Sequence, residues 1–568
     1  MNDIILHAFD WHYADIANNA EKIAGLGYGA VLIPPPLYSR DDESGKEWWN
    51  RYQPRDYRIL RSFLGNKAGL ERAIAALHGN GVRVYADIVF NHMANENRPD
   101  RGNFPGDAEL QRYKQERSEY EKDRLYGSLD EGLFSPWDFN TDGNIQNWMD
   151  LHEATEHSLS GLPDLDLNQW VIDQQRACLR ALNGMQFDGY RIDAVKHLPE
   201  YHLRSVFETA DMAGKYLFGE ALTSNDREEG AFLWPLLDHT GMSFYDFPLH
   251  ETLRRTFSLS GSMRELVDPA AFRQALLWWR AVTFSVTHDM PNNDGFRGIM
   301  LHPQDEYLAN VYLLGRDGGV PLVYSDNNQS AGKYPEDRNR WANSWMRGDI
   351  AAMIRFHNDV HGMPQRSLFE DDGYIVFARG DSSMVAINKT SCWQHPTIRT
   401  WGLHKGAYRC QIHGHVMDVT GDHFLDNVDV GGITLKPRYQ NQGLPYLLAL
   451  LNSRLFAWYF PFVSAPFRGG WMSANRQFLS QLPFRALDFA NEVDRSYCDE
   501  LGRLVAVMID TKAQLSKAQT DRGKAYYESK SAGIDRQIDS VVYDIYALTG
   551  EEIAQVEADV SGEKSDHG

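Results

Sequence analysis

The sequence has few cysteines and no long apolar segment. Its 568 residues include only four cysteines, which are too few and too scattered for a disulfide framework or a zinc site, so we expect free thiols. No apolar run is long enough to cross a bilayer. The N-terminal stretch MNDIILHAFDWHYAD lacks the basic region and the small-residue cleavage site of a signal peptide. We therefore expect a cytoplasmic protein that does not associate with a membrane.

Positive charge is also scarce: 57 Lys and Arg residues stand against 78 Asp and Glu residues, for a formal net charge of −21. A general nucleic-acid-binding protein needs a basic surface for the phosphate backbone, and this composition argues against one. A neutral substrate is compatible with it. The apolar fraction of 43% is ordinary for a folded protein, and the length predicts three or four domains.

Strand-like and helix-like segments alternate along the first part of the chain. Residues 4–6, 30–33 and 82–89 are strand-like, and the helical periodicity between them indicates parallel βαβ units. We expect Asp15 to cap the first of these helices. The alternation resumes after residue 170, with strand-like segments at 189–192, 216–219, 243–247, 282–286 and 320–324. Eight strands are the number that a (β/α)8 barrel needs.

Changes in composition divide the chain into four predicted domains. The barrel comprises residues 1–92 and 171–362 and closes with a helix near 341–357. A polar segment at 93–170 breaks the alternation and is predicted to be an inserted domain after the third strand. Short alternating strands follow at 363–438 and predict an antiparallel β-sandwich domain. Residues 439–568, called the tail below, are predicted to form a mainly helical domain, with an apolar run at 444–460 that must be buried.

Acidic residues end four of the predicted barrel strands. Asp87 ends the third strand, Asp193 the fourth, Glu220 the fifth and Asp289 the seventh. Each acid alone could equally cap a helix or lie on the surface. In a barrel, however, these strand ends meet at one face, where the active site lies. Two carboxylates on either side of a glycosidic bond are what its hydrolysis requires, so the group predicts a glycosidase site.

The segments around these acids resemble the signature regions of glycoside hydrolase family 13, the α-amylase family. Residues 87–92 match Asp-x-Val-x-Asn-His, and residues 189–197 match Gly-x-Arg-x-Asp-x-x-Lys-His in full. The Glu220 segment, the His288-Asp289 pair and the Leu-Pro-Asp-Leu-Asp stretch at 162–166 resemble three further regions. The order and spacing agree as well, and the resemblance covers residues 1–438.

This resemblance implies the roles of the catalytic residues. Asp193 is expected to be the nucleophile, Glu220 the general acid and base, and Asp289 the third carboxylate, which holds sugar hydroxyls. Arg191 lies two residues before Asp193, hence on the same strand face, where its charge would keep the nucleophile ionised. Glu220 has no basic neighbour in the sequence, which fits a raised pKa and the acid role.

The resemblance also implies substrate contacts. His92 and His288 resemble hydroxyl-binding histidines, and Tyr52 resembles the aromatic platform under the sugar. Lys196 and His197 resemble contacts on the leaving-group side. The residue after the nucleophile, the Lys-His pair and the Leu-Pro-Asp stretch resemble members that cleave α-1,4 rather than α-1,6 links.

Family members often carry a structural calcium ion, for which the resemblance implies three ligands. Asn91 and Asp164 match the side-chain ligands, and His197 matches the residue that supplies a backbone carbonyl. Oxygen donors of these types suit Ca²⁺. We assign no further ligand within residues 141–160. The alternative is that Asp164 caps or pairs within its loop.

The expected function is therefore retaining endo-hydrolysis of α-1,4-glucosidic bonds in starch, glycogen or maltooligosaccharides. One alternative is α-glucan transglycosylation, in which a sugar rather than water attacks the intermediate. A catalytically dead glucan-binding module would be expected to lack one of the three carboxylates, and this chain has all three. A third alternative is a DNA-associated protein acting through the tail.

The tail resembles a different family. Residues 446–456 and 481–483, with segments near 534–543 and 548–553, resemble the target-recognition region of Type II restriction-modification adenine methyltransferases. No Asn-Pro-Pro-Tyr-type catalytic motif of those enzymes occurs in the chain. From Asn441 onward there are 13 Lys and Arg residues against 17 Asp and Glu residues, whereas a DNA-reading domain is normally basic. We therefore favour a packing or interaction module over DNA binding.

Overall fold

The computed structural model describes residues 2–40, 47–96, 103–258, 260–327, 334, 337, 339–390, 398–414, 416–419, 443–464, 482–489, 491–518 and 521–561. The chain divides into two compact units. The first consists of Met1–Thr390 with Gln394–Asp429, and the second of Ser391–Trp393 with Val430–Gly568. The predicted boundary at 438 lies outside the described residues.

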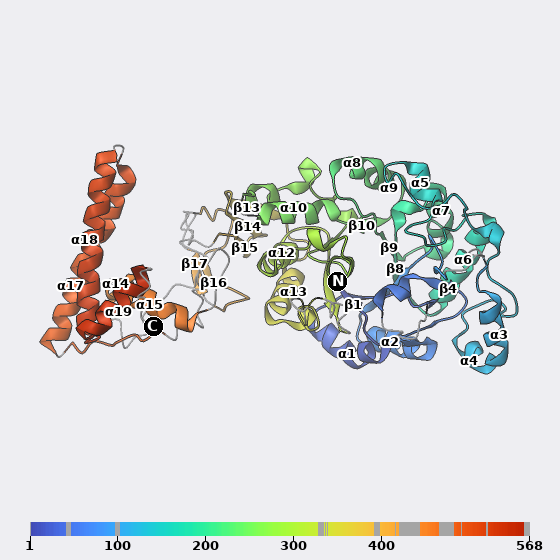
Figure 1. Ribbon diagram of the computed structural model, residues 1–568, viewed down its shortest axis with the longest axis horizontal. Helices are drawn as coiled ribbons and strands as arrows, with labels where there is room; N and C mark the ends of the chain where they lie inside the picture. The colour runs from blue at the N-terminus through green and yellow to red at the C-terminus, as the bar shows by residue number, and fades with distance from the viewer. Residues whose placement is uncertain are drawn as a thin grey trace, which may run out of the picture. The chain divides into compact units, whose positions relative to one another are not determined.

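Eight parallel strands form a closed barrel in the first unit (Figure 1), which confirms the predicted (β/α)8 fold. The strand order around the barrel is sequential, and the last strand pairs with the first, with Leu6 opposite Val323. The strands are β1 (Ile5–Phe9), β2 (Ala30–Ile33), β7 (Arg83–Ile88), β8 (Gly189–Ile192), β9 (Tyr216–Gly219), β10 (Ser243–Tyr245), β11 (Ala281–Phe284) and β12 (Val320–Asp326).

Helices surround this barrel. The principal ones are α1 (Tyr13–Leu26), α2 (Lys67–Gly79), α6 (Gln169–Gly184), α7 (Glu200–Phe207), α10 (Phe247–Phe257), α12 (Pro303–Gly315) and α13 (Gly348–Val360). The expected cap at Asp15 is wrong, because α1 begins two residues earlier with His12 at the N-cap position. Asp15 lies instead in the first turn, where its charge interacts favourably with the helix dipole.

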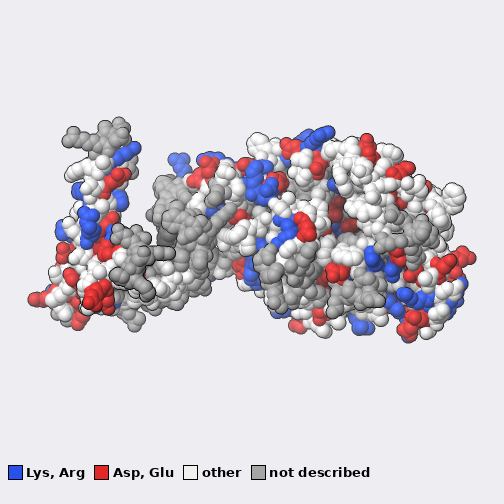
Figure 2. All heavy atoms as spheres, in the orientation of Figure 1, with Lys and Arg blue, Asp and Glu red and all other residues white. Residues whose placement is uncertain are grey.

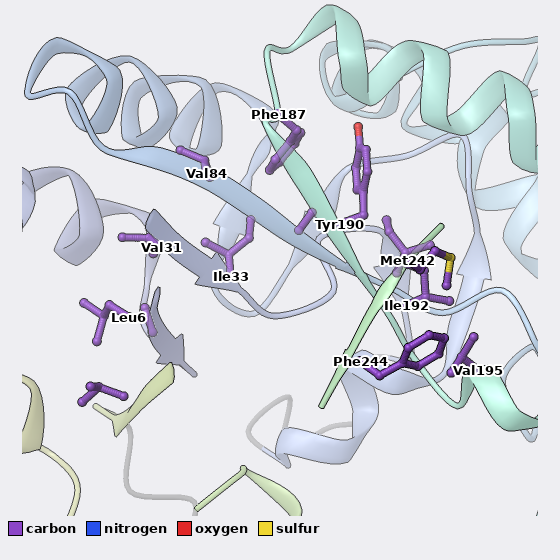
Figure 3. Close-up of a cluster of buried hydrophobic side chains, with 14 of the residues drawn as sticks. Leu6, Val31, Ile33, Val84, Phe187, Tyr190, Ile192, Val195, Met242 and Phe244 are labelled. Carbon is purple, nitrogen blue, oxygen red and sulfur yellow. The ribbon is translucent and has the colours of Figure 1, made fainter. Parts of the chain in front are cut away.

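The two faces of the barrel strands build two separate parts of the core. Leu6, Val31 and Val84 point outward into the larger apolar cluster, which contacts the surrounding helices (Figure 3). Their neighbours Ile5 and Leu32 belong to the cluster inside the barrel. This separation follows from the two-residue period of a strand. The barrel interior is therefore packed with side chains, and the site must lie at a barrel end.

The segment between β7 and α6 forms the inserted region. It contains α3 (Asp107–Gln115), α4 (Arg117–Asp123), the 3-10 turn Pro136–Asp138 and α5 (Leu151–Glu156). Two isolated bridges, His92 with Asp164 and Phe139 with Leu165, join its ends. The inserted region thus returns to the chain just after the strand that it leaves.

Short antiparallel strands follow the barrel, as predicted for this part of the chain. β13 (Gln365–Glu370), β14 (Tyr374–Arg379) and β15 (Ser383–Asn388) form one sheet, and β16 (Gly406–Arg409) pairs with β17 (Val416–Val419). Tyr374 and Val419, one from each sheet, belong to a single apolar cluster. The buried Arg379 guanidinium donates to the carbonyls of Gly315 and Val360 and so holds β14 against the barrel helices.

The second unit has a helical core of its own. Its helices are α14 (Gly443–Asn452), α15 (Arg454–Val463), α17 (Glu492–Lys517), α18 (Asp521–Ile545) and α19 (Gly550–Ser561). Ser453 separates α14 from α15, because its hydroxyl caps the second helix by accepting from the Phe456 N–H. Leu450 and Phe456 of the apolar run pack with Val542 in one cluster. The run is therefore buried by helices of its own unit. Among the described helices, none is long and apolar enough to span a membrane.

Because each unit has its own apolar core, the first should remain folded without the second. A chain that ends at residue 438 should melt within about 2 °C of the corresponding transition in the full chain. For a unit of this size, that difference corresponds to a change of less than ~1 kcal/mol in the free energy of unfolding. Differential scanning calorimetry of both chains measures this. A much larger loss would mean that the tail stabilises the barrel.

Candidate active site

The carboxyl ends of β7, β8 and β9 bring distant acids together. Asp87 pairs with Arg191 across β7 and β8, and Ile192 pairs with Gly219 across β8 and β9. The ladder continues past the strands, because the Asp193 N–H donates to the Ile88 carbonyl and the Glu220 N–H to the Ile192 carbonyl. Main-chain hydrogen bonds therefore fix the places from which the acidic side chains extend.

One buried guanidinium binds three of these acids. Nη1 of Arg191 lies 2.8 Å from Oδ1 of Asp87 and 2.7 Å from Oδ1 of Asp193. Nη2 lies 2.6 Å from Oε1 of Glu220, a close ion pair without the alignment of a hydrogen bond. The side chain of Arg191 is fully buried. Asp87, which ends a signature strand but was given no role in the sequence analysis, is thus a positioning residue for this arginine.

The idea that Glu220 lacks a basic neighbour holds in the sequence but is wrong in space. Burial raises the pKa of Glu220, and the negative charge of Asp193 acts in the same direction, while Arg191 opposes both. Burial likewise raises the pKa of Asp193 against the opposing charge of Arg191. The acid role of Glu220 therefore rests on burial and not on distance from a cation.

The pKa of Asp289 depends on the neighbouring Glu220. Burial, followed by the charge of Glu220, raises the pKa of Asp289 well above its usual range, and the two carboxyl groups hydrogen-bond to each other. Two carboxyl groups in contact cannot both ionise at low cost, so the pair retains one proton between them. The hydrogen bond raises the pKa of Asp289 and lowers that of Glu220, so it favours the proton on Asp289.

Tyr52 and two histidines lie beside the acids. The Tyr52 hydroxyl donates to Oδ2 of Asp87 at 2.9 Å, and its ring is stacked on His288 with a centroid distance of 5.0 Å. Nε2 of His92 lies 3.0 Å from the Tyr52 carbonyl. Burial lowers the pKa of His92 to about 4 and that of His288 well below its ordinary value. Both imidazoles are therefore neutral at pH 7 and suited to binding uncharged hydroxyls.

Lys196 and His197 follow the nucleophile in a 3-10 turn, Val195–His197. Nζ of Lys196 donates to the Leu222 carbonyl at 2.9 Å, which places it just beyond the Glu220 strand end. Nδ1 of His197 lies 2.7 Å from the Ala154 carbonyl of α5. The His197 ring is thus buried against the inserted region.

The predicted metal ligands lie where the inserted region meets the barrel. Nδ2 of Asn91 donates to Oδ1 of Asp164 at 3.2 Å, and Nδ2 of Asn140 donates to Oδ2 at 2.8 Å. Asn140 also donates to Glu156 at 3.2 Å. Burial raises the pKa of Asp164 to about 8, and the charge of Glu156 adds to this effect. The structure thus adds Asn140 and Glu156 to the candidate oxygen donors. No spacing in the sequence marks them, because loop folding brings them to Asp164.

Comparisons with known proteins agree with this fold. Residues 14–233 match the family model for the α-amylase catalytic domain. An α-amylase of Aeromonas hydrophila is 45% identical over 419 residues, which cover 72% of this chain and 88% of that protein. An α-amylase of Thermomonospora curvata is 28% identical over 470 residues, or 78% of this chain and 70% of that protein.

Solved structures show the same fold. A mutant of α-amylase I from Eisenia fetida, determined as a maltohexaose complex, matches with a TM-score of 0.63 and 21% identity over 76% of this chain and 95% of that chain. The site is that of a glycoside hydrolase built on a (β/α)8 barrel. The chain belongs to the α-amylase family, and the prediction of an α-amylase-type glycoside hydrolase is confirmed.

Two substitutions test the catalytic assignments, which remain predictions. Asp193→Asn keeps the side-chain volume but removes the nucleophile, so kcat on soluble starch should fall by on the order of 10⁴ or more. Glu220→Gln should lower starch hydrolysis by about 10²–10⁴-fold, because the leaving oxygen is no longer protonated. An α-glucosyl fluoride needs little protonation, so Glu220→Gln should still release fluoride in an initial burst, while hydrolysis of the Asp193 ester, which needs Glu220 as base, should stay slow.

Circular dichroism of both variants serves as the folding control. Near-normal starch activity in a folded Asp193→Asn protein would refute the nucleophile assignment. A loss of the initial fluoride-release burst in Glu220→Gln as large as the loss of starch hydrolysis would refute the acid role.

Proposed function

We propose that this chain hydrolyses internal α-1,4-glucosidic bonds of an α-glucan with retention of configuration. The observation that carries the proposal is the shared guanidinium: Asp193 and Glu220 bind neighbouring terminal nitrogens of Arg191. This keeps the two carboxylates side by side, as a nucleophile and acid pair requires. Retaining enzymes hold such a pair roughly 5–5.5 Å apart, without room for an intervening water.

In the first step, Asp193 attacks the anomeric carbon while Glu220 protonates the leaving glycosidic oxygen. A glycosyl ester of Asp193 forms, and the rest of the glucan leaves. In the second step, the deprotonated Glu220 removes a proton from water, which attacks the anomeric carbon and releases Asp193. Asp289 and the neutral His92 and His288 bind hydroxyls of the reacting sugar.

Glucan transfer uses the same ester and differs only in the attacking group. A sugar hydroxyl then takes the place of water in the second step. The same carboxylates serve hydrolysis and transfer, so the two reactions are distinguished by their products.

Retention makes a direct prediction for the first products. Because two inversions occur at the same carbon, proton NMR early in starch hydrolysis should show the α-anomer before mutarotation. Chromatography of the same samples should show a range of maltooligosaccharides, as internal cleavage produces. Early β-anomer would contradict the two-step mechanism. When a short maltooligosaccharide is the substrate instead of starch, products longer than that substrate would indicate transfer.

We also propose that Ca²⁺ binds where the inserted region meets the barrel. The predicted ligands are Asn91, Asp164 and the His197 carbonyl, and Asn140 and Glu156 add further amide and carboxylate oxygens. The groups acting on the buried Asp164 are amides and further carboxylates, an arrangement that a hard cation would neutralise. When bound, the ion would hold the inserted region against the barrel.

Calcium should therefore raise the melting temperature of the chain. A ligand that binds only the native state stabilises it by about 2.7 kcal/mol at one hundred times its Kd. Thermal melts of a chelator-treated sample with and without CaCl2 measure the effect. Asp164→Asn should abolish the shift, whereas Asp142→Asn, which alters an exposed acid of the same region, should keep it. An unchanged melting temperature in a sample proven metal-free would reject the site.

For the tail we propose a packing or interaction module. Acidic and basic side chains are interspersed over α17 and α18 on the face seen in Figure 2, which does not suit a phosphate backbone. Gel shifts of the full chain with mixed-sequence duplex at low salt test the DNA alternative. Salt-sensitive or sequence-selective retardation would overturn this preference.

A further inference from the structure

Two histidines and an aspartate meet at the end of the barrel opposite the catalytic acids. His357 lies in the last turn of α13, and His361 follows the end of that helix four residues later, so both rings are on one side. Asp3 lies just before β1. Its Oδ1 is 2.9 Å from Nε2 of His357, and its Oδ2 is 3.7 Å from Nδ1 of His361. One donor atom from each residue lies within 4.8 Å of the others.

The environment of His357 orients its ring. Nδ1 lies 3.2 Å from the carbonyl of Leu314, near the end of α12. A histidine that binds a metal usually donates its other ring N–H to such a carbonyl, which leaves the opposite nitrogen free to coordinate. The His357 side chain is 5% exposed, whereas those of Asp3 and His361 are 21% and 47% exposed. The cluster thus combines a fixed inner ligand with an open outer side.

We propose that Asp3, His357 and His361 bind a divalent transition-metal ion of the zinc class. Two imidazoles and one carboxylate, with water at the remaining position, form a common zinc coordination set. Imidazole nitrogen favours Zn²⁺, Cu²⁺ and Ni²⁺ over Ca²⁺ and Mg²⁺, which take oxygen ligands. The site therefore differs in chemistry from the oxygen-lined site at Asp164.

The position of the cluster assigns the ion a structural role. Asp3 precedes the first barrel strand, while the catalytic acids follow the opposite ends of the strands. The barrel closes between β1 and β12, and α13 follows β12. Asn358 of the same helix already donates to the Gly27 carbonyl at 2.9 Å. A bound ion would add a second link between the start of the barrel and its last helix.

A second group with suitable donors occurs in the described part of the inserted region. Asp142, His152 and His157 also place one donor atom each within 4.8 Å. Asp142 and His152 are exposed, and the group lies next in sequence to Glu156 of the proposed calcium site. It is the natural competitor for added zinc, so it supplies the matched control.

The test uses the full chain, stripped of transition metals and then saturated with CaCl2. Calorimetric titration with ZnCl2 should show a binding event, and Zn²⁺ should raise the melting temperature. His361→Gln should raise the Kd for zinc at least about tenfold and abolish the zinc-dependent rise in melting temperature. Loss of a residue that only hydrogen-bonds to a metal ligand already lowers metal affinity about 10–100-fold. His152→Gln should preserve both.

His361→Gln removes a half-exposed side chain, so its melting temperature without zinc and its kcat on soluble starch should match the parent. Co²⁺ in place of Zn²⁺ gives a second readout, a visible absorption band that should disappear in His361→Gln. The proposal is overturned if the parent shows no zinc-dependent shift, or if His361→Gln binds like the parent. Loss of binding in His152→Gln alone would also overturn it, by assigning the zinc to the inserted region.

Discussion

The active site depends on the buried positive charge of Arg191. Arg191 stands among Asp87, Asp193, Glu220 and Asp289, and it contacts the first three directly. Burying one of these carboxylates without a partner would cost several kcal/mol, so the cluster requires the guanidinium in order to fold. The same cation leaves the group with more carboxylates than charges to balance them. Burial and this excess of negative charge raise the pKa values of Glu220 and Asp289.

Main-chain geometry places this charge cluster. The parallel ladder sets Asp193 and Glu220 through N–H donation to the preceding strands. The inserted region leaves the barrel directly after β7 and returns through the bridge of His92 with Asp164. A predicted sugar-binding residue and a proposed metal ligand are therefore paired on one short bridge. Order in the inserted region and order at the sugar site are physically linked.

Most of the fold could be predicted from the sequence because its signals are local, and the same motifs located acids that the structure brings together. Eight strands carry short apolar runs, and the acids follow them within motifs of fixed spacing. The contacts that the sequence did not predict join residues that are distant in the sequence and close only in the folded chain. The reach of Arg191 to Glu220 requires a closed barrel, and the approach of Asn140 to Asp164 requires a folded loop. The tail shows the same division: its apolar run predicted burial, whereas the helix break at Ser453 follows from a capping hydroxyl.

Ala194, between the nucleophile and the 3-10 turn, has a left-handed backbone with φ of 48°, which is uncommon for a residue other than glycine. Its N–H faces Oε2 of Glu220 at 3.4 Å, and the next N–H donates to the Glu220 carbonyl. This bend ties the two catalytic strand ends together through the backbone. Because this connection consists of main-chain atoms, substitution of neighbouring side chains should leave the relative placement of Asp193 and Glu220 unchanged.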